Sequence, residues 1–412
     1  MERIGGRLLF RQKWRNEMKR FFAAVQAAAL CALCFCASSC GKKTIACAAE
    51  KRGVDFGFAA SVTDLLSEDT QKLLASEAKI LVAENCMKSS LLRPNKTFWN
   101  WSDPESLVKF AEKNKIVAKW HTLFWHEMNP PFINSLKTKE EAEAMMDEHI
   151  TTVMQKFKGR IRDYDVVNEM FNEDGSLRDT VWLRTLGPGY LERALRKAHE
   201  VDPAAHLFLN EYNNEAAGYA KADAMYELVK DFVERGVPIY GVGMQLHLAA
   251  DLPYDEDAIR ANIRRYAELG IKICFSEVDV RVPLSRLEEL EPKQKQIWTS
   301  LMKLAVEEPN VESFIVWGVS DKNSWIPAWK PGYGNALLFD KDFKPKPIYF
   351  ELVEAAQGKE KEKPRLKRGA SFVIRGAFWG LQASPKKILD IPQNIGYSVK
   401  SCVNEHAKKG FF

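Results

Sequence analysis

Hydrophobic and polar positions alternate in a regular order along most of the chain, where short apolar runs are separated by longer amphipathic segments. The amphipathic segments, among them 103–114, 139–157 and 219–236, repeat apolar residues at i, i+3 and i+4, which predicts helices. The apolar runs have the length of buried strands. We predict strands at 54–62, 80–87, 116–125, 161–169, 205–213, 239–248, 271–280 and 312–321.

Local signals mark the ends of several predicted helices. Asp103 followed by Pro104 is typical of an N-cap and a first helical residue. Gly236 is expected to end the helix 219–236, because glycine adopts the left-handed conformation that terminates many helices. The segment 347–357, "PIYFELVEAAQ", is predicted to be the last helix of the folded region.

The order of strands and helices indicates an α/β fold. Strands that alternate with helices form a parallel sheet, and eight such units in roughly 300 residues predict a closed (β/α)₈ TIM barrel, here as a single catalytic domain. A doubly wound open sheet is the alternative. The chain lacks a G-x-G-x-x-G after its first strand and a G-x-x-x-x-G-K-[ST], so dinucleotide or nucleotide binding has no support and no cofactor is expected.

Charge divides the chain into three parts. Residues 1–43 carry a net charge of +7 and residues 358–412 carry +8, although the whole chain sums to +5, which leaves about −10 for the part between them. An acidic body binds nucleic acid poorly, so no nucleic-acid partner is expected. The composition, 46% hydrophobic and 28% charged, argues against a membrane-embedded or disordered chain.

The N-terminal region has the pattern of an export signal. "MKR" at Met18–Arg20 precedes an apolar stretch of seventeen residues and then "SSC", which ends at Cys40. The stretch is too short for a spanning helix and its end is rich in small residues, as in a signal peptide. Cys40 resembles the modified cysteine of a bacterial lipoprotein, which predicts a lipid anchor at the cell surface or in the periplasm. Cleavage after Ala48, with secretion, is the alternative, and Met18 is a candidate start.

These features give a domain plan. Residues 1–48 are predicted to form the N-terminal extension, signal segment and linker, 49–357 the barrel, and 358–412 a basic, poorly ordered tail or a small accessory element. Past the signal segment the cysteines at 86, 274 and 402 are too widely spaced for a zinc site or a disulfide framework, so free thiols are expected. We expect a monomer.

Polar residues gather where the predicted strands end, which is the edge of a barrel that carries active sites. One polar residue at a strand end is commonly a cap or a satisfied core group, but this pattern recurs on seven of the eight strands. The residues are Glu84, Asn85 and Lys88; His121, Trp125 and His126; Asn168 and Glu169; Asn210 and Tyr212; Gln245 and His247; Glu277 and Asp279; and Trp317, Asp321 and Trp325.

This set suits glycoside hydrolysis, which needs two carboxylates with different protonation states. Glu169 and Glu277 are the candidate pair. His247, oriented by Asp279, is expected to keep Glu277 ionised, and Asn168 is placed to donate to a sugar 2-hydroxyl. Tryptophans are more often core residues, but at a barrel mouth their faces stack on sugar rings.

Five segments resemble, in order, the signatures of glycoside hydrolase family 10, the retaining endo-1,4-β-xylanases: "WHTLFWH", "DVVNEMF", "GVGMQLH", "FSEVDV" and "WGVSDKNSW". The resemblance runs from about residue 54 to 356. It implies that Glu169 is the acid/base, that Glu277 is the nucleophile, and that His247 and Asp279 orient the nucleophile. It also implies a site that grips xylan on the non-reducing side of the cut, with Tyr212 nearer the leaving side. The gripping residues are Glu84, Asn85, Lys88, His121, Trp125, Asn168, Gln245, Trp317 and Trp325.

Two departures from the family pattern concern the outer sugar subsites. Ser89-Ser90 stands where an aromatic residue is frequent, and "EMNPPFI" follows His126 in place of a glutamine-containing loop. Neither touches the expected chemistry. No metal site is expected, because His121 and His126 are five residues apart outside a helix, with no ligand cluster around them. A β-1,4-glucanase on the same scaffold and a non-catalytic carbohydrate-binding protein are the rival functions.

Overall fold

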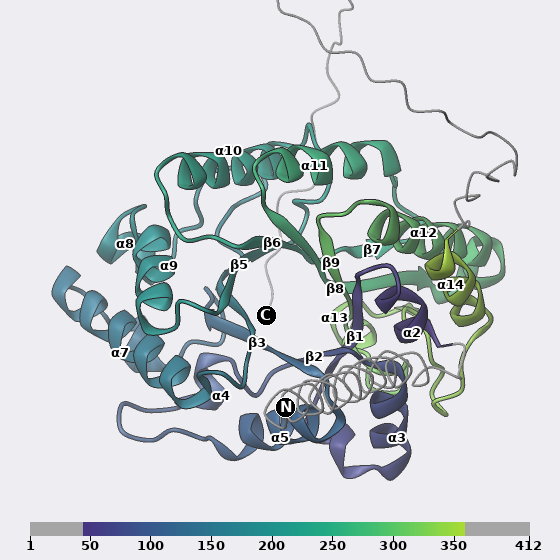
Figure 1. Cartoon of the computed structure of the whole chain (residues 1–412), viewed down its shortest axis with the longest axis horizontal. Coiled ribbons are helices and arrows are strands. Elements are labelled where there is room, and N and C mark those ends of the chain that lie inside the picture. Colours follow the sequence, from purple (N-terminus) through teal and green to yellow (C-terminus); the bar gives the residue numbers. More distant parts are fainter. Residues whose placement is uncertain (1–43, 359–412) are drawn as a thin grey trace, which may run out of the picture. The chain divides into compact units, whose positions relative to one another are not determined.

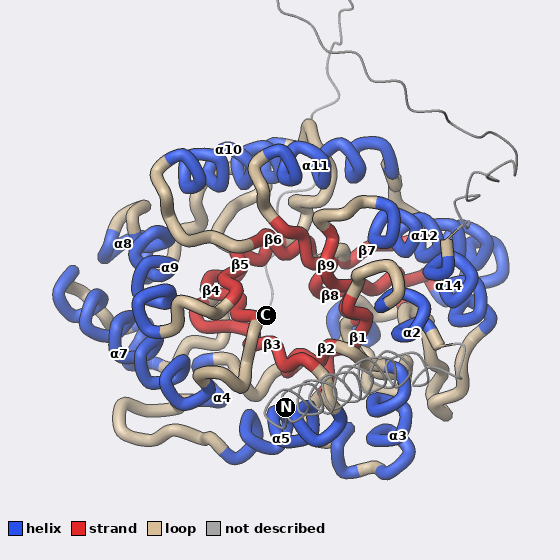
Figure 2. The backbone as a smooth tube through the Cα atoms, viewed as in Figure 1, coloured by secondary structure: helices blue, strands red, loops and turns tan. Residues whose placement is uncertain are grey.

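The computed structural model describes residues 44–358, and these residues form a closed barrel of eight parallel strands. Each strand pairs with the next along the chain, and β8 pairs with β9, which in turn pairs with β1 and closes the ring (Figures 1 and 2). The open-sheet alternative is therefore wrong. The barrel strands are β1 (Asp55–Ala60), β2 (Ile80–Ala83), β3 (Val117–Phe124), β4 (Asp163–Asn168), β5 (His206–Glu211), β6 (Gly241–Met244), β8 (Lys272–Pro283) and β9 (Val311–Val316).

Helices surround the strand ring on the outside, as Figure 2 shows. They follow the strands in chain order, so each strand and its helix form one unit of the barrel, and short extra elements lie in the loops. The helices are α2 (Ile45–Glu50), α3 (Glu68–Glu77), α4 (Ser89–Leu92), α5 (Ser102–Asn114), α6 (Pro131–Asn134), α7 (Lys139–Phe157), α8 (Val181–Leu186), α9 (Tyr190–Val201), α10 (Ala220–Glu234), α11 (Glu256–Glu268), α12 (Leu287–Glu307), α13 (Ile326–Trp329) and α14 (Pro347–Gln357); the short strands are β7 (His247–Ala249) and β10 (Tyr333–Gly334).

The sequence predictions agree closely with these elements. Each predicted strand contains or overlaps a barrel strand, and the predicted helices 103–114, 139–157 and 347–357 match α5, α7 and α14. Gly236 has a φ of +64° just past the end of α10, as its capping role requires. The predicted cap at Asp103 is wrong, because α5 already begins at Ser102 and the Glu105 amide donates to the Trp101 carbonyl.

Two apolar layers stabilise the barrel. The larger layer fills the space between the strands and the helices, and a smaller cluster fills the inside of the ring. Cys86 and Cys274 are free thiols, as expected from their spacing, and Cys402 lies outside the described residues. The inner cluster consists of Ala59, Ile80, Val82, Phe208, Cys274, Ile315 and Trp317.

The described fold begins five residues before the predicted domain boundary at residue 49. The helix α2 starts at Ile45, is capped by the Thr44 side chain, and buries Ile45, Ala46 and Ala49 in the main core. The tail, 358–412, and the signal segment lie outside the described residues except for Gly358 and 44–48. Within 44–358, none of the helices has both the length and the apolar content needed to cross a bilayer.

Candidate active site

Glu169 and Glu277 lie in one network of amide side chains at the carboxyl ends of the strands. The Asn210 amide donates to one oxygen of Glu277 at 2.7 Å and to the Asn168 carbonyl oxygen at 2.8 Å. Asn168 and Gln245 in turn donate to one oxygen of Glu169, at 3.2 and 3.1 Å. Four neighbouring strand ends thus supply the network that joins the two carboxylates.

The second oxygen of Glu277 faces His247. The His247 Nε2 lies 3.3 Å from this oxygen, and its Nδ1 lies 2.9 Å from an oxygen of Asp279. Trp325 donates its indole N–H to the same Asp279 oxygen at 2.9 Å. Because ionised carboxylates accept but do not donate hydrogen bonds, His247 satisfies both neighbours only as an imidazolium.

Electrostatics keep the Glu277 carboxylate ionised. Burial alone would raise its pKa, but the charge of His121, the hydrogen bond and charge of His247, and the charge of Lys88 outweigh burial and lower the pKa of Glu277 to about 2. Burial would likewise lower the pKa of His247, yet Asp279 and Glu277 raise that pKa to about 10. Glu277 is therefore a carboxylate at every pH at which the protein is expected to work.

The ends of β2, β3 and β9 bring a second group of predicted residues together. The Lys88 ammonium donates to the Asn85 side chain at 3.0 Å and lies 4.8 Å from the ring centroid of Trp125 and 5.9 Å from that of Trp317. Burial lowers the pKa of Lys88 and raises the pKa of Glu84. This group combines flat aromatic faces with donors and acceptors, the combination that binds sugars.

A buried carboxylate, Asp165, holds the His121 ring in this group. The His121 Nδ1 lies 3.0 Å from Asp165, which also accepts from the Lys119 ammonium at 2.6 Å, and all three side chains are buried. The edge of the His121 ring points at Trp317, with centroids 5.2 Å apart. Asp165 thus fixes the orientation of the imidazole, whose other nitrogen remains available to a ligand.

Tyr212 stands apart from that group, beyond the end of β5. Arg178 donates to its hydroxyl at 2.9 Å, and the Lys221 ammonium lies 3.2 Å from its ring centroid. Lys221 itself pairs with buried Glu211 at 2.9 Å. Arg178 also donates to the Glu169 carbonyl oxygen at 3.1 Å, so it connects Tyr212 with the backbone of the candidate acid/base.

The two departures from the family pattern meet in space. The Ser90 amide donates to the Met128 carbonyl at 2.7 Å, which joins the loop after β2 to the loop after β3. In the second loop, His126 lies 3.7 Å from the free oxygen of Glu169 and 3.5 Å from Glu127. The two loops therefore meet at Ser90 and Met128, and His126, which precedes the changed segment, lies beside Glu169.

Sequence reasoning left out several residues that the structure brings into the site. Asn210 was recognised as a strand-end residue but not as a partner of Glu277, and Gly243 on the adjacent strand leaves the space that the Asn210 side chain occupies. Arg178 and Lys221 gave no signal, because they lie in loop and helix segments far from the strand ends in sequence. Asp321, conversely, pairs with Lys346 at 2.7 Å and supports a loop.

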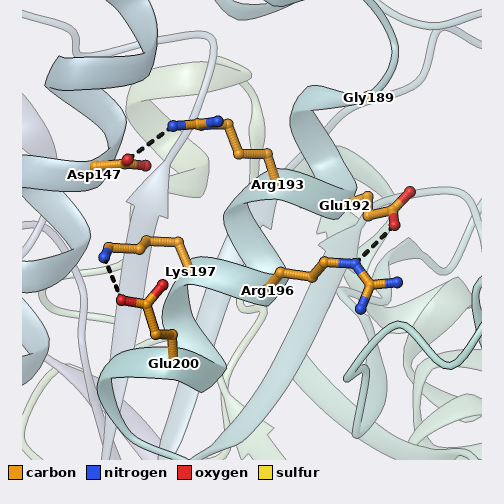
Figure 3. Close-up of a pocket in the computed structure, with 7 residues that line it drawn as sticks. All are labelled: Asp147, Gly189, Glu192, Arg193, Arg196, Lys197 and Glu200. Atoms are coloured by element: carbon orange, nitrogen blue, oxygen red, sulfur yellow. Dashed lines mark hydrogen bonds and ion pairs between the residues drawn. The ribbon is translucent and has the colours of Figure 1, made fainter.

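Two hollows differ sharply in character. One, of about 510 Å³, lies beside His247 and is lined by Arg281 of β8 and by residues that follow β5 and β6, including Tyr219, Lys221, Leu252 and Tyr254. The other, of about 410 Å³, lies against the outer helix α9, where the charges are already paired: Arg193 with Asp147, Arg196 with Glu192 and Lys197 with Glu200 (Figure 3). Among residues 44–358, no three His, Cys, Asp or Glu side chains form a metal-binding group.

A (β/α)₈ barrel that joins an ionised carboxylate to a second carboxylate across a cleft defines a glycosidase type of site. The profile of glycosyl hydrolase family 10 matches residues 44–355. The chain therefore belongs to glycosyl hydrolase family 10, and it is a glycoside hydrolase.

Relatives of known name support this assignment. The chain is 36% identical over 336 residues to the endo-1,4-beta-xylanase B of Thermotoga neapolitana, which covers 80% of this chain and 96% of that protein. It is similar to the crystal structure of native xylanase 10B from Thermotoga maritima, at 37% identity and a TM-score of 0.74, over 76% of this chain and 98% of the other. The xylanase 10B of Thermotoga petrophila RKU-1, solved in complex with xylobiose, matches at the same identity and TM-score, over 76% and 97%.

Proposed function

We propose that this protein is an endo-1,4-β-xylanase that cuts internal β-1,4-xylosidic bonds of xylan with retention of configuration. The observation that carries the proposal is the contrast within the carboxylate pair. Glu277 is held ionised by His247, while Glu169 shares its amide network but has one oxygen free of hydrogen bonds within the described residues. An ionised nucleophile beside a carboxyl group that exchanges its proton is what double displacement requires.

In the first step, the Glu277 carboxylate attacks the anomeric carbon while Glu169 protonates the departing oxygen. The bond to the leaving sugar breaks as the bond to Glu277 forms, through a transition state that resembles an oxocarbenium ion. Asn168 is placed to donate to the 2-hydroxyl of the reacting sugar, a contact that strengthens as positive charge develops. Asn210 and His247 hold the two Glu277 oxygens in position during the attack.

In the second step, Glu169 acts as a base. Having given up its proton, it takes one from a water molecule that attacks the anomeric carbon, and the bond to Glu277 breaks. The two inversions release a sugar of the original β configuration. The residues proposed to grip the chain on the non-reducing side are Glu84, Asn85, Lys88, His121, Trp125, Gln245, Trp317 and Trp325, and Tyr212 is proposed to contact the leaving side.

The β-1,4-glucanase alternative has one specific observation in its favour. A relative named exoglucanase XynX, from Acetivibrio thermocellus, is 36% identical over 301 residues, which cover 69% of this chain and 27% of that protein. Against this alternative, Trp317 and Trp325 lie around His247, the partner of Glu277, with ring centroids 6.4 and 5.0 Å from its own. Xylose lacks the hydroxymethyl group that glucose would have to fit beside these rings. We expect glucan to be cut far more slowly than xylan.

The test is to measure new reducing ends on unsubstituted xylan and on soluble β-1,4-glucan, and to follow the anomeric protons of a xylo-oligosaccharide product by NMR. Rapid release of β-sugar from xylan is expected. Equal rates on the two polymers would favour the glucanase, and initial release of the α-anomer would exclude double displacement. Binding without cleavage would favour the non-catalytic alternative.

We propose that the chain is exported and carries a lipid at Cys40, and that it works as a monomer, because one chain supplies the whole described cleft. Cleavage before Cys40 leaves α2 intact, whereas cleavage after Ala48 would remove Ile45 and Ala46 from the core. In a bacterial host, Cys40→Ala should move activity from the membrane fraction to the soluble fraction. Unchanged partitioning would contradict the anchor, and light scattering tests the monomer.

A further inference from the structure

Arg281 is a charged residue of the cleft that the proposed mechanism leaves without a role. It lies on β8 four residues after Glu277, on the same side of the strand, and it lines the hollow of about 510 Å³ beside His247. Four residues of a strand span about 13 Å, so Arg281 lies closer to the carboxyl end of β8 than the nucleophile does. The segments after β5 and β6 line the same hollow, and because Tyr212 also follows β5, we assign the hollow to the leaving-group side of the proposed function.

The guanidinium of Arg281 is fixed in place but has no counter-ion. One terminal nitrogen donates to the carbonyls of His247 and Leu248 at 3.0 and 3.2 Å, and the group lies 5.0 Å from the ring centroid of Trp329. The residue is only 6% exposed, its Nε is buried without a partner, and no carboxylate among the described residues pairs with it. A buried cation is costly unless an anion compensates it, which indicates that a ligand completes this site.

The acidic residues of the same hollow are already engaged elsewhere. Glu173 accepts from Lys221 at 3.1 Å and from Asn213 at 3.1 Å. Asp255 caps α11 by accepting the Ala258 amide at 2.9 Å. Asp251, two residues past Ala249, the β7 residue that pairs with Arg281, accepts from the Tyr333 hydroxyl at 2.7 Å. Among the described residues, no carboxylate forms an ion pair with Arg281.

Glu215 adds a second group without a partner to this wall. One of its carboxyl oxygens is buried and makes no hydrogen bond, and burial raises the pKa of Glu215. A buried polar oxygen without a partner is the kind of group that a bound ligand satisfies. The exposed indole of Trp329, which stacks on Trp325 with centroids 4.9 Å apart, borders Arg281 on the cleft side.

We propose that Arg281 is a specificity-determining residue that binds the carboxylate of a uronic acid substituent carried by the xylan chain on the leaving-group side. This inference rests on the proposed xylanase function. The carboxylate supplies the counter-ion that the protein itself does not, and the planar guanidinium suits a carboxylate in a charge-assisted contact. The alternative role is purely structural, in which Arg281 only ties the β6–β7 segment to Trp329.

A matched pair of substrates distinguishes the carboxylate-binding role of Arg281 from the purely structural role. Glucuronoxylan is compared with the same polymer after its carboxyl groups have been reduced to hydroxymethyl groups, which removes the charge and keeps the branching. We expect the wild-type enzyme to show a kcat/KM roughly tenfold higher on the native polymer, the size of one charge-assisted hydrogen bond. Salt screens the approach of a charged substrate, although it screens a buried charge pair less than an exposed one, so the ratio should fall moderately as ionic strength rises.

Substitutions of Arg281 test whether this residue causes the preference for the charged polymer. Arg281→Gln should bring the ratio of the two rates to about one, and Arg281→Lys should retain part of it. Arg286→Gln is the control, because it removes a nearby positive charge that is exposed and paired with Glu289 at 2.6 Å. This control should keep the wild-type ratio.

The outcomes distinguish the inference from the function on which it rests. Equal wild-type rates on the two polymers, or an equal loss on both in Arg281→Gln, would overturn the role of Arg281 while leaving the xylanase intact. The wild-type comparison decides the matter even if Arg281→Gln folds poorly. Failure to cut unsubstituted xylan at all would instead overturn the proposed function.

Discussion

Glu277 and Glu169 are the same residue type and belong to one hydrogen-bond network, yet their surroundings differ in almost every respect. Glu277 lies within the long strand β8, its side chain is 7% exposed, and both of its oxygens accept hydrogen bonds. Glu169 follows the end of β4 with a φ of +56°, and its second oxygen has only His126, at 3.7 Å. Both oxygens of Glu277 are therefore fixed by hydrogen bonds, whereas one oxygen of Glu169 has no hydrogen bond among the described residues.

This difference teaches how one side-chain chemistry is divided into two roles. The strand, the amide of Asn210 and the imidazolium of His247 stabilise the charged form of Glu277, which a nucleophile needs. Glu169 has no cation as close, and the two amides that contact it share a single oxygen. In the proposed mechanism, the Glu169 oxygen without a hydrogen bond serves the leaving oxygen first and a water molecule later.

The largest expected effect comes from removing each carboxylate in turn. Glu277→Ala should abolish turnover of every substrate, because no group remains to form the covalent intermediate. Glu169→Ala should lose about 10² to 10⁴ in rate on xylan but still form the intermediate from an aryl xylobioside with an acidic phenol. Burst kinetics measure that step.

Azide sharpens the same test. It needs no base, so it should restore turnover in Glu169→Ala and yield a β-glycosyl azide, whereas Glu277→Ala should at most yield the α-azide. NMR of the products reports their configuration. Swapped configurations would reverse the two roles assigned here.

The next largest effect concerns the positive charge of His247, which stabilises the ionised form of Glu277. His247→Gln removes the cation beside Glu277, so the pKa of Glu277 should rise from about 2 by about one to three units. The acid limb of the kcat/KM profile, which reports groups of the free enzyme, should move to higher pH by that amount. His199→Gln, on the exposed side of α9, is the matched control, and an unmoved acid limb in His247→Gln would refute this account.

A smaller effect is expected from the bridging amide. Asn210→Ala removes the donor to Glu277 and to Asn168, and should lower kcat roughly ten- to a hundredfold, as for other hydrogen bonds to charged groups. Asn213→Gly, in the loop that follows the same strand, keeps the positive φ of that position and should leave kcat unchanged. If both variants lose activity equally, the loop rather than the amide network is responsible.

The smallest effect is on stability. The pKa of His247 is raised from an ordinary 6.5 to about 10, so its imidazolium contributes stability that is fully present below pH 6.5 and is lost as the pH rises through about 10. The difference in melting temperature between wild type and His247→Gln should therefore narrow between pH 6.5 and pH 10. A constant difference over that range would show that His247 is not an imidazolium in the folded protein.

Most of the fold could be read from local pattern. The predicted strands are short and apolar, and apolar residues recur in the helices with a helical period, so the eight strand–helix units and their order are predictable from the sequence. The same pattern predicts that polar residues gather at the carboxyl ends of the barrel strands. The start of α5 was misplaced because Asp103 and Pro104 carry a cap signal that the backbone bond from Glu105 to Trp101 overrides. The start of the barrel was placed at residue 49 because the alanine-rich α2 resembles the end of a signal segment.

The sequence alone determined which residues reach the mouth of the barrel, since a strand that ends in Asn-Glu or Glu-Val-Asp places them there whatever their neighbours are. Only the tertiary structure decided which of them touch. The Asn210 bridge to Glu277 and the contact of Arg178 with Tyr212 join residues 67 and 34 positions apart. The contact of Lys221 with Tyr212 brings helix α10 against the end of β5, and the Nε of Arg281 without a partner depends on which groups the fold places around it. The periodicity of apolar residues is a local property of the chain. Which side chains contact one another, and which lack a partner, depends on the closed ring that brings distant strand ends side by side.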